Sequence, residues 1–189
     1  MLLELLFAAT LSGQDVYTQE ECLHRYEEEG VVEPWDAAGC LVSWIYSAET
    51  HAALDPFGRD MEAVFSRDAI AAIEAARARW PGDGLAPGLD ADPFCDCQDP
   101  EGLFLILQIT REESPTRVTS GVAFAFKPED VTEEEFVQLL IGENAPPVTQ
   151  RVVILVLEDR GWRVDDISDG EGYFFRASLA LPADSTPAP

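Results

Sequence analysis

The feature that most constrains the fold is a pair of apolar segments in the C-terminal third of the chain. Residues 150–157 read QRVVILVL, a run too apolar for a loop, and residues 162–168 read WRVDDIS. Asp159, Arg160 and Gly161 lie between the two segments and predict a turn. A β-branched run, a glycine-bearing turn and an alternating second run predict a β-hairpin, so the core contains a sheet.

The rest of the chain supplies further strands and a layer of helices. Apolar runs at residues 103–110 and 117–126 predict two more strands, joined by a turn at residues 112–115. Apolar residues at helical spacing predict three helices, over residues 36–48, 61–65 and 66–80. Helices followed by antiparallel strands predict an α+β fold, in which the N-terminal helices pack on a curved antiparallel sheet. Such a sheet can hold a pocket between its concave face and the helices.

The chain length indicates how the sequence is divided. The 189 residues suit one domain with a full core. We expect residues 1–14 to form a signal segment or an N-terminal helix, and residues 15–181 to form the domain. Residues 128–149 are an insertion in which TEEE, at residues 132–135, caps a short helix. Residues 182–189 have the composition of a disordered tail.

The first residues bear on the compartment. Residues 2–11 read LLELLFAATL, which resembles the apolar core of a secretion signal. No basic residue precedes this run and Glu4 interrupts it, and a true start codon upstream of Met1 would explain the missing basic residues. The run is too short to span a bilayer. We therefore expect a periplasmic or secreted protein rather than a cytoplasmic one.

The charge is strongly one-sided, with 36 acidic residues against 12 basic ones and a formal net charge of −24. This field repels the phosphates of nucleic acids and anionic lipids, which argues against both as partners. It attracts a basic protein, a cationic ligand or a divalent metal, although solubility or adaptation to salt also accounts for it. The sequence leaves the oligomeric state open.

Four cysteines allow either two disulfides or a zinc site. Cys95 and Cys97 are expected to be too close to pair, so each is expected to form a bridge with Cys22 or Cys40. Disulfides are favoured over zinc, because C-x-C with two distant single cysteines is not a zinc-knuckle pattern. Free buried thiols are the alternative to both.

An acidic loop surrounds the second pair of cysteines. Residues 90–99 read DADPFCDCQD, and their carboxylates belong to Asp90, Asp92, Asp96 and Asp99. These four could hold a hard cation such as calcium, although the run is not an EF-hand loop. The favoured interpretation is that the carboxylates accept hydrogen bonds from turn amides, with disulfides fixing the loop. We therefore expect neither a metal nor a cofactor.

The expected pocket has two kinds of candidate residues. Asp165 and Asp166 are neighbours on a strand, so their side chains point to opposite faces and one can enter the pocket. A carboxylate there could act as a general base, whereas the favoured alternative is that it binds backbone amides. Trp44, Trp162 and Phe124, with Asp165, are the residues expected to contact a ligand, although such aromatic residues more often fill the core.

Three short strings resemble a known family. They are FSRDAIAAI at residues 65–73, DADPF at residues 90–94 with Gln98-Asp99 just after it, and GWRVDDI at residues 161–167. They resemble the bacterial family called domain of unknown function 3828, which implies a nuclear-transport-factor-2-like or cystatin-like fold, shaped like a cone, and frequent export. That superfamily contains enzymes, ligand carriers and adaptors, so the resemblance does not choose a function. The sequence departs from the family pattern at Cys95-Asp96-Cys97 and at residues 128–149.

Catalytic motifs are scarce. His24 lies in a polar region and His51 is predicted in a loop, so a His–Asp dyad would need one of them folded back. Residues 173–175 are three consecutive aromatics, and an exposed one would indicate a partner. The sequence therefore predicts an exported binding domain without catalysis, recognising a basic protein or a small ligand. The alternative is a small isomerase or hydratase that uses Asp165 or Asp166 as its base, and an accessory of the cell envelope is a third hypothesis.

Overall fold

The computed structural model describes residues 34–80, 86, 88–97, 102–142 and 144–180. The predicted signal segment, the predicted tail, and Cys22, His24 and Asp99 lie outside the described residues. Along the described chain four helices come first and the antiparallel strands follow, with one helix inserted between the second and third strands and one after the fourth, as the α+β prediction requires. None of the described helices is long and apolar enough to cross a membrane.

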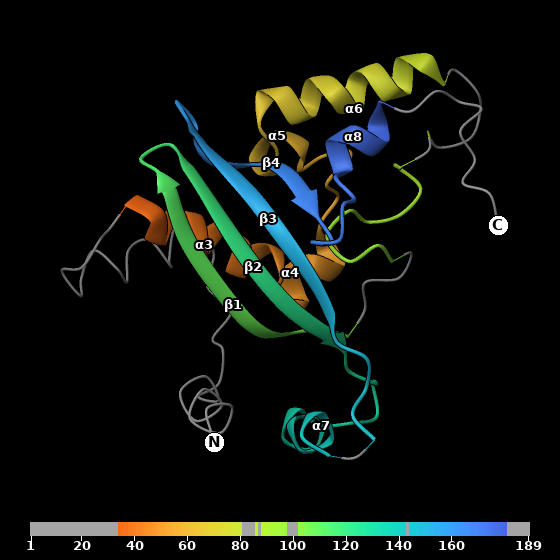
Figure 1. The fold of residues 1–189 in the computed structure, drawn as a ribbon. Helices are drawn as coiled ribbons and strands as arrows, with labels where there is room; N and C mark the ends of the chain where they lie inside the picture. Colours follow the sequence, from red (N-terminus) through yellow and green to blue (C-terminus); the bar gives the residue numbers. More distant parts are fainter. Residues whose placement is uncertain (1–33, 81–85, 87, 98–101, 143, 181–189) are drawn as a thin grey trace.

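The sheet has four strands, and strands that follow one another in the sequence are neighbours in the sheet. The strands are β1 (Leu103–Ser114), β2 (Arg117–Phe126), β3 (Thr149–Glu158) and β4 (Gly161–Ser168). Their order is β1-β2-β3-β4, and every neighbouring pair is antiparallel (Figure 1). The α+β class and the C-terminal hairpin are confirmed. Gly161, with a φ of 92°, begins β4 directly after the hairpin turn, in a conformation that glycine adopts without strain.

The predicted turn at residues 112–115 is wrong in its position. Arg111 pairs with Thr119 and Glu112 with Val118, so β1 continues to Ser114 and the turn lies at residues 115–116. The charged side chains at residues 111–113 are exposed, and strand pairing uses only backbone groups. Charge therefore does not end this strand.

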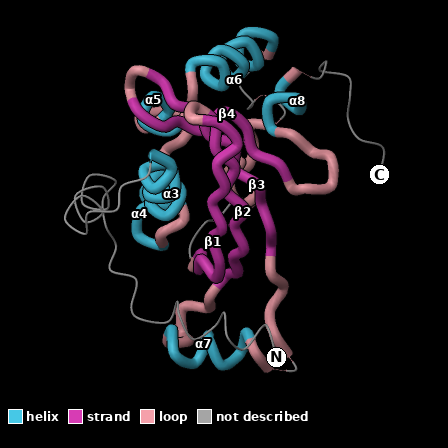
Figure 2. The backbone as a smooth tube through the Cα atoms, turned by 60° about the vertical axis from the view of Figure 1, so that its left-hand side comes forward, coloured by secondary structure: helices cyan, strands magenta, loops and turns pink. Residues whose placement is uncertain are grey.

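The described helices are α3 (Pro34–Ile45), α4 (Ala48–Ala53), α5 (Met61–Val64), α6 (Arg67–Arg79), α7 (Glu133–Leu140) and α8 (Phe175–Leu179). The helices other than α7 lie on one face of the sheet or at its β4 edge (Figure 2). Figure 2 shows α3 and α4 on one side of the sheet, and α7 beyond the end of the strands. The helices α5, α6 and α8 contact β4.

Three polar side chains determine where helices begin. The helix predicted over residues 36–48 is divided in two, because the hydroxyl of Ser47 accepts the N–H of Thr50 and starts α4. Ser66 accepts the N–H of Ala69 at 3.0 Å and starts α6, where the helix over residues 66–80 is predicted to begin. The predicted capping box at Thr132 forms at the start of α7.

Aromatic rings fill the space between the sheet and the helices. Phe124 on β2 lies 5.5 Å from Tyr46, ring centroid to centroid, and Tyr46 lies 6.0 Å from Phe94. Phe65 lies 5.8 Å from both Phe94 and Phe175. All five side chains are fully buried, so they form one continuous row of rings through the core.

Candidate functional site

The aromatic residues expected to contact a ligand belong to the packed core. Phe124 is fully buried, Trp162 is 4% exposed and Trp44 is half-buried against the same cluster. None of these three residues, nor Asp165, lines either of the hollows described below. The structure therefore does not gather the predicted ligand residues around an opening in the described part of the molecule.

Asp165 is held by an arginine and a serine. Nη1 of Arg176 donates to both carboxylate oxygens at 2.9 Å, and the hydroxyl of Ser66 donates to Oδ1 at 2.8 Å. Arg117 adds a more distant positive charge, with its Nη1 at 3.8 Å from Oδ2. The carboxylate thus joins α8 and the start of α6 to β4, and an already paired group is a poor general base.

Asp166 has a similar role through backbone groups. Its Oδ1 accepts the N–H of Ile167 at 2.9 Å and the N–H of Arg176 at 3.0 Å. The second bond attaches the first turn of α8 to β4. The pairing of β3 with β4 shifts at this point, because Ile154 pairs with Asp166 while Leu155 pairs with Val164. Asp165 is the extra residue of a β-bulge, an irregularity that redirects a side chain.

The prediction that Cys95 and Cys97 are too close to pair is wrong. These two residues form a disulfide with a Cα–Cα distance of 5.1 Å, which is within the usual range. Asp96 between them has a φ of 56°, so the chain turns back on itself at that residue. Aspartate tolerates this left-handed conformation better than most residues. Cys40 also takes part in a disulfide.

The acidic loop forms one wall of a surface hollow of about 600 Å³. Three of the four predicted cation ligands line this hollow, namely Asp90, Asp92 and Asp96. The loop after β4 contributes two further carboxylates, from Asp169 and Glu171. The other described residues of the lining are Gly88, Ala91, Pro93, Val148, Gln150, Arg151 and Tyr173. We call this site the acidic hollow.

The charges of the acidic hollow are only partly compensated. Nη2 of Arg151 lies 3.9 Å from Oδ2 of Asp96, and it is the basic side chain among the described lining residues. The N–H groups of Glu171 and Tyr173 donate to Asp169 and hold the pKa of that carboxyl below its usual range. Tyr173 lines the same hollow and is 43% exposed, so an exposed aromatic side chain shares the hollow with these carboxylates.

A second hollow, of about 620 Å³, lies on the face of the sheet away from α3. Gln108 of β1 binds Ser43 and Gly39 of α3, so its neighbour Ile109 points to the opposite face. Ile109 pairs with Gly121 of β2 and is 61% exposed. Arg111, Glu112 and Glu113 also line this hollow, so its charge is mixed.

The prediction that His51 lies in a loop is wrong. It lies in α4 rather than in a loop, and its side chain is fully buried. Its Nδ1 is 2.9 Å from the carbonyl oxygen of Ile45, whereas its Nε2 has no hydrogen-bond partner among the described residues. Nε2 lies 3.7 Å from Oδ2 of Asp92. The surrounding letters AETHAA contain no signal for a buried histidine.

Asp92 connects this buried histidine to the acidic hollow. Its Oδ1 accepts the N–H of Phe94 at 2.8 Å, and its Oδ2 faces His51. Burial raises the pKa of the Asp92 carboxyl above its ordinary value, against the opposite effects of His51 and of the N–H groups of Phe94 and Cys95. The structure therefore brings a histidine and an aspartate together, which the sequence analysis considered only as a remote alternative.

Comparison with known proteins gives one distant likeness. No family model matches the chain, and no curated protein matches it. One chain of the crystal structure of the type VI native effector–immunity complex Tae3–Tai3 from Ralstonia pickettii is similar, with a TM-score of 0.41 and 15% sequence identity. The match covers 72% of this chain and 96% of that chain. A likeness of this degree carries no argument about function, and the family resemblance drawn from the sequence stays a prediction.

Proposed function

We propose that this protein is an exported, non-catalytic domain that binds a basic protein, with a lysine or arginine side chain of the partner docking in the acidic hollow. The observation that carries the proposal is the composition of that hollow. Five carboxylates and an exposed tyrosine ring line it together with Arg151, in a chain with a formal net charge of −24. Such a surface attracts cationic partners from a distance and accelerates their encounter.

The filled interior supports recognition on the outside of the molecule. The row of buried rings from Phe124 to Phe175 occupies the space in which a small ligand would bind. Asp165 is paired with Arg176, which disfavours the alternative of an isomerase or hydratase that uses this residue as a base. The surface hollows are therefore the better candidates for a binding site.

The dimensions and chemistry of the acidic hollow suit a long cationic side chain. A guanidinium or ammonium group can pair with the exposed carboxylates of Asp90, Asp96 and Glu171. The ring of Tyr173 can add a cation–π contact, because its negative face attracts a positive charge. The hollow beside Ile109 has mixed charge, so it is less suited to a basic partner.

The cysteines support the proposed export. The Cys95–Cys97 disulfide and the oxidised state of Cys40 are typical of proteins in an oxidising compartment. The apolar run at residues 2–11 is consistent with a secretion signal, although it lies outside the described residues. We therefore propose a periplasmic or secreted location.

A fluorescent oligoarginine peptide tests the proposal by fluorescence anisotropy at low salt. Replacing two hollow carboxylates, Asp90→Asn with Asp96→Asn, should weaken peptide binding about tenfold, since two charge contacts are lost. The matched control is Glu62→Gln with Glu74→Gln, which removes the same charge from exposed positions on α5 and α6. We expect this control to weaken binding less than about twofold. Equal losses in the two double variants would mean that the net charge alone attracts the peptide.

Two single variants sharpen the test. Arg151→Gln removes the positive side chain from the lining and should strengthen peptide binding about threefold. Tyr173→Ala removes the ring and should weaken binding about threefold, whereas Tyr173→Phe keeps the ring and should not. A Tyr173→Phe variant as weak as Tyr173→Ala would exclude the cation–π contact.

A further inference from the structure

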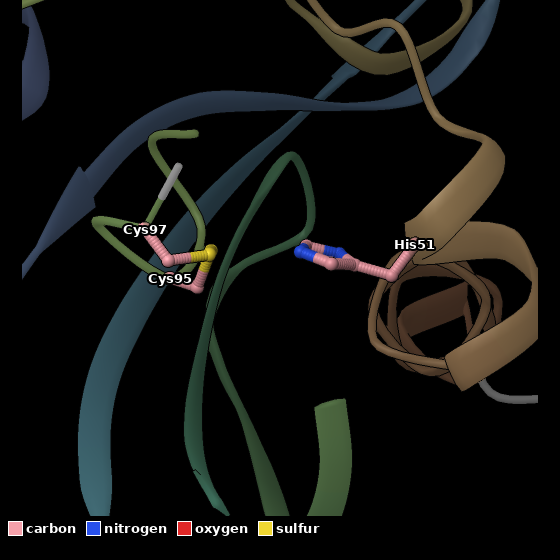
Figure 3. A group of neighbouring side chains, drawn as sticks. All are labelled: His51, Cys95 and Cys97. Carbon is pink, nitrogen blue, oxygen red and sulfur yellow. A yellow bond between two sulfur atoms is a disulfide. The ribbon is translucent and has the colours of Figure 1, made fainter. Parts of the chain in front are cut away.

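The second candidate site lies behind the acidic hollow, where His51 faces the disulfide loop. Ligand atoms of His51, Cys95 and Cys97 all lie within 4.8 Å of one another. Figure 3 shows the ring of His51 reaching from its helix toward the two sulfur atoms, which come from the loop on the opposite side. His51 and Cys95 are buried and Cys97 is half-buried, so solvent is largely excluded from the cluster.

The ring of His51 is oriented like that of a metal ligand. The oxygen of Ile45 can only accept a hydrogen bond, so Nδ1 carries the proton and donates it at 2.9 Å. In the neutral ring, Nε2 then presents its lone pair toward the two sulfurs and Asp92. Histidines that bind metals usually donate their other ring N–H to a carbonyl or carboxylate, which fixes the ring as it is fixed here.

Nε2 has nothing among the described residues to satisfy its lone pair. It is fully buried, has no hydrogen-bond partner and lies 3.7 Å from a carboxylate oxygen, which also carries lone pairs. When the imidazole is neutral, Nε2 is a buried acceptor without a donor, which is unfavourable, and the carboxylate beside it adds repulsion. A cation placed between the two atoms would satisfy both.

We propose that the reduced form of this protein binds zinc, or a similar thiophilic divalent cation, through His51, Cys95 and Cys97, with the negative charge of Asp92 close to the His51 ligand. In a tetrahedral site with metal–ligand distances of about 2.0–2.3 Å, the ligand atoms lie roughly 3.3–3.8 Å apart. The ligand atoms of His51, Cys95 and Cys97 already lie within 4.8 Å of one another, so they can reach this spacing once the S–S bond is broken. Oδ1 of Asp92 stays bound to the N–H of Phe94, which orients the carboxylate.

The disulfide controls access to this site. An external dithiol supplies two electrons and two protons, which convert the Cys95–Cys97 disulfide into two thiols while the dithiol becomes a disulfide. The metal then displaces both thiol protons to solvent, and the two thiolates become ligands. In the oxidised protein the two sulfurs are bonded to each other, so no thiolate is available. The inference does not depend on the proposed function of the acidic hollow, and it concerns the reduced chain rather than the oxidised form expected after export.

Cobalt is the probe, because Co²⁺ occupies zinc sites and its absorption reports the ligands. The full chain, reduced with a phosphine, is titrated with Co²⁺ in the absence of air. We expect a thiolate-to-cobalt charge-transfer band and intense d–d bands, which indicate tetrahedral sulfur ligation, and we expect zinc to bleach them. The oxidised protein should give neither band. Reduced wild-type protein without these bands would overturn the proposal.

Variants of the candidate residues show which side chains bind the metal. Cys95→Ser with Cys97→Ser leaves the other two cysteines in place and should abolish the charge-transfer band. His51→Ala should weaken Co²⁺ binding at least about tenfold. Asp92→Asn removes a negative charge close to His51 and should weaken binding by a smaller factor than His51→Ala, whereas Asp90→Asn should have little effect. Bands of unchanged intensity in the double cysteine variant would place the metal on other residues and contradict the proposal.

A measurement on the wild-type chain avoids variants that fail to fold. Bound zinc should protect Cys95 and Cys97 of the reduced protein from alkylation, at least about tenfold in rate relative to a chelator-treated sample. Mass spectrometry of the peptide that contains both residues measures this protection. Equal alkylation rates with zinc and with chelator would overturn the proposal, whatever the variants show.

Discussion

Two largely buried aspartates of this protein have opposite surroundings. Asp165 receives two bonds from Arg176 and one from Ser66, so its charge is balanced inside the fold. Oδ2 of Asp92 faces the unpartnered Nε2 of His51 at 3.7 Å, and burial raises the pKa of its carboxyl. The first arrangement is a stabilising contact between β4 and two helices. The second leaves a buried nitrogen without a hydrogen-bond partner among the described residues, and groups with perturbed pKa values are common at functional sites.

This contrast moves the candidate functional site from the Asp165–Asp166 pair to the acidic loop. From the sequence, a general base at Asp165 or Asp166 was the alternative to a structural role, and the acidic loop was also expected to be structural. The structure gives the Asp165–Asp166 pair roles in holding α6 and α8, and it joins the acidic loop to His51 and to an open hollow. Four variants test the contrast.

The largest effect is expected at the paired aspartate. Arg176→Ala leaves Asp165 without its main partner and should lower the free energy of unfolding by about 2–3 kcal/mol, measured by urea denaturation. Arg117→Ala is the control, because its Nη1 is 3.8 Å from the same carboxylate and its cost should stay below about 1 kcal/mol. Equal costs for the two variants would show that Arg176 is not the principal partner.

Ser66→Ala should have the next largest effect, because the hydroxyl accepts the N–H of Ala69 at the start of α6 and donates to Asp165. We expect a loss of about 1–2 kcal/mol in the free energy of unfolding. Ser66→Thr keeps the hydroxyl and should recover most of the loss. A Thr variant as unstable as the Ala variant would argue that packing, rather than the hydroxyl, is responsible.

Asp92→Asn should stabilise the protein, by about 1 kcal/mol at neutral pH, because the amide can donate to Nε2 of His51 while its oxygen still accepts from Phe94. The control is Asp90→Asn, which removes the same charge from an exposed position and should change stability by less than about 0.5 kcal/mol. Urea denaturation of the oxidised proteins measures both. A destabilised Asp92→Asn variant would mean that the carboxylate pairs favourably with a protonated His51.

The same variant has a defined pH dependence. Asp92 has a higher pKa in the folded than in the unfolded state, so the folded protein binds more protons at this group. Its contribution to stability is therefore largest below the unfolded value and falls as the pH rises through the raised folded value. Asparagine does not titrate, so the advantage of Asp92→Asn over wild type should grow with pH across this window. An advantage independent of pH would contradict the raised pKa.

The smallest effect is expected from Asp166→Asn. The amide oxygen of asparagine can accept the same N–H groups of Ile167 and Arg176, so the free energy of unfolding should change by less than about 0.5 kcal/mol. Asp166→Ala removes the acceptor and should cost about 1 kcal/mol by urea denaturation. A large loss in the Asn variant would show that the negative charge, rather than the acceptor, is needed.

The candidate sites show which contacts a sequence can predict. The Ser66 cap and the Thr132 capping box were predictable, because each depends on a donor three residues away. The pairing of Asp165 with Arg176 was not, although only eleven residues separate them, because a bulge and a helix start determine its geometry. The Cys95–Cys97 disulfide was missed because it depends on the backbone conformation of Asp96.

By itself the sequence determined the α+β class, the four strands and the strongly acidic surface, because side-chain periodicity and charge are local properties of the chain. The tertiary structure alone decided that rings fill the interior and that five carboxylates share one hollow. It also placed His51 beside Asp92 and the sulfurs of Cys95 and Cys97, residues more than forty positions further along the chain. Such contacts arise only when separate segments pack together, which no local pattern encodes.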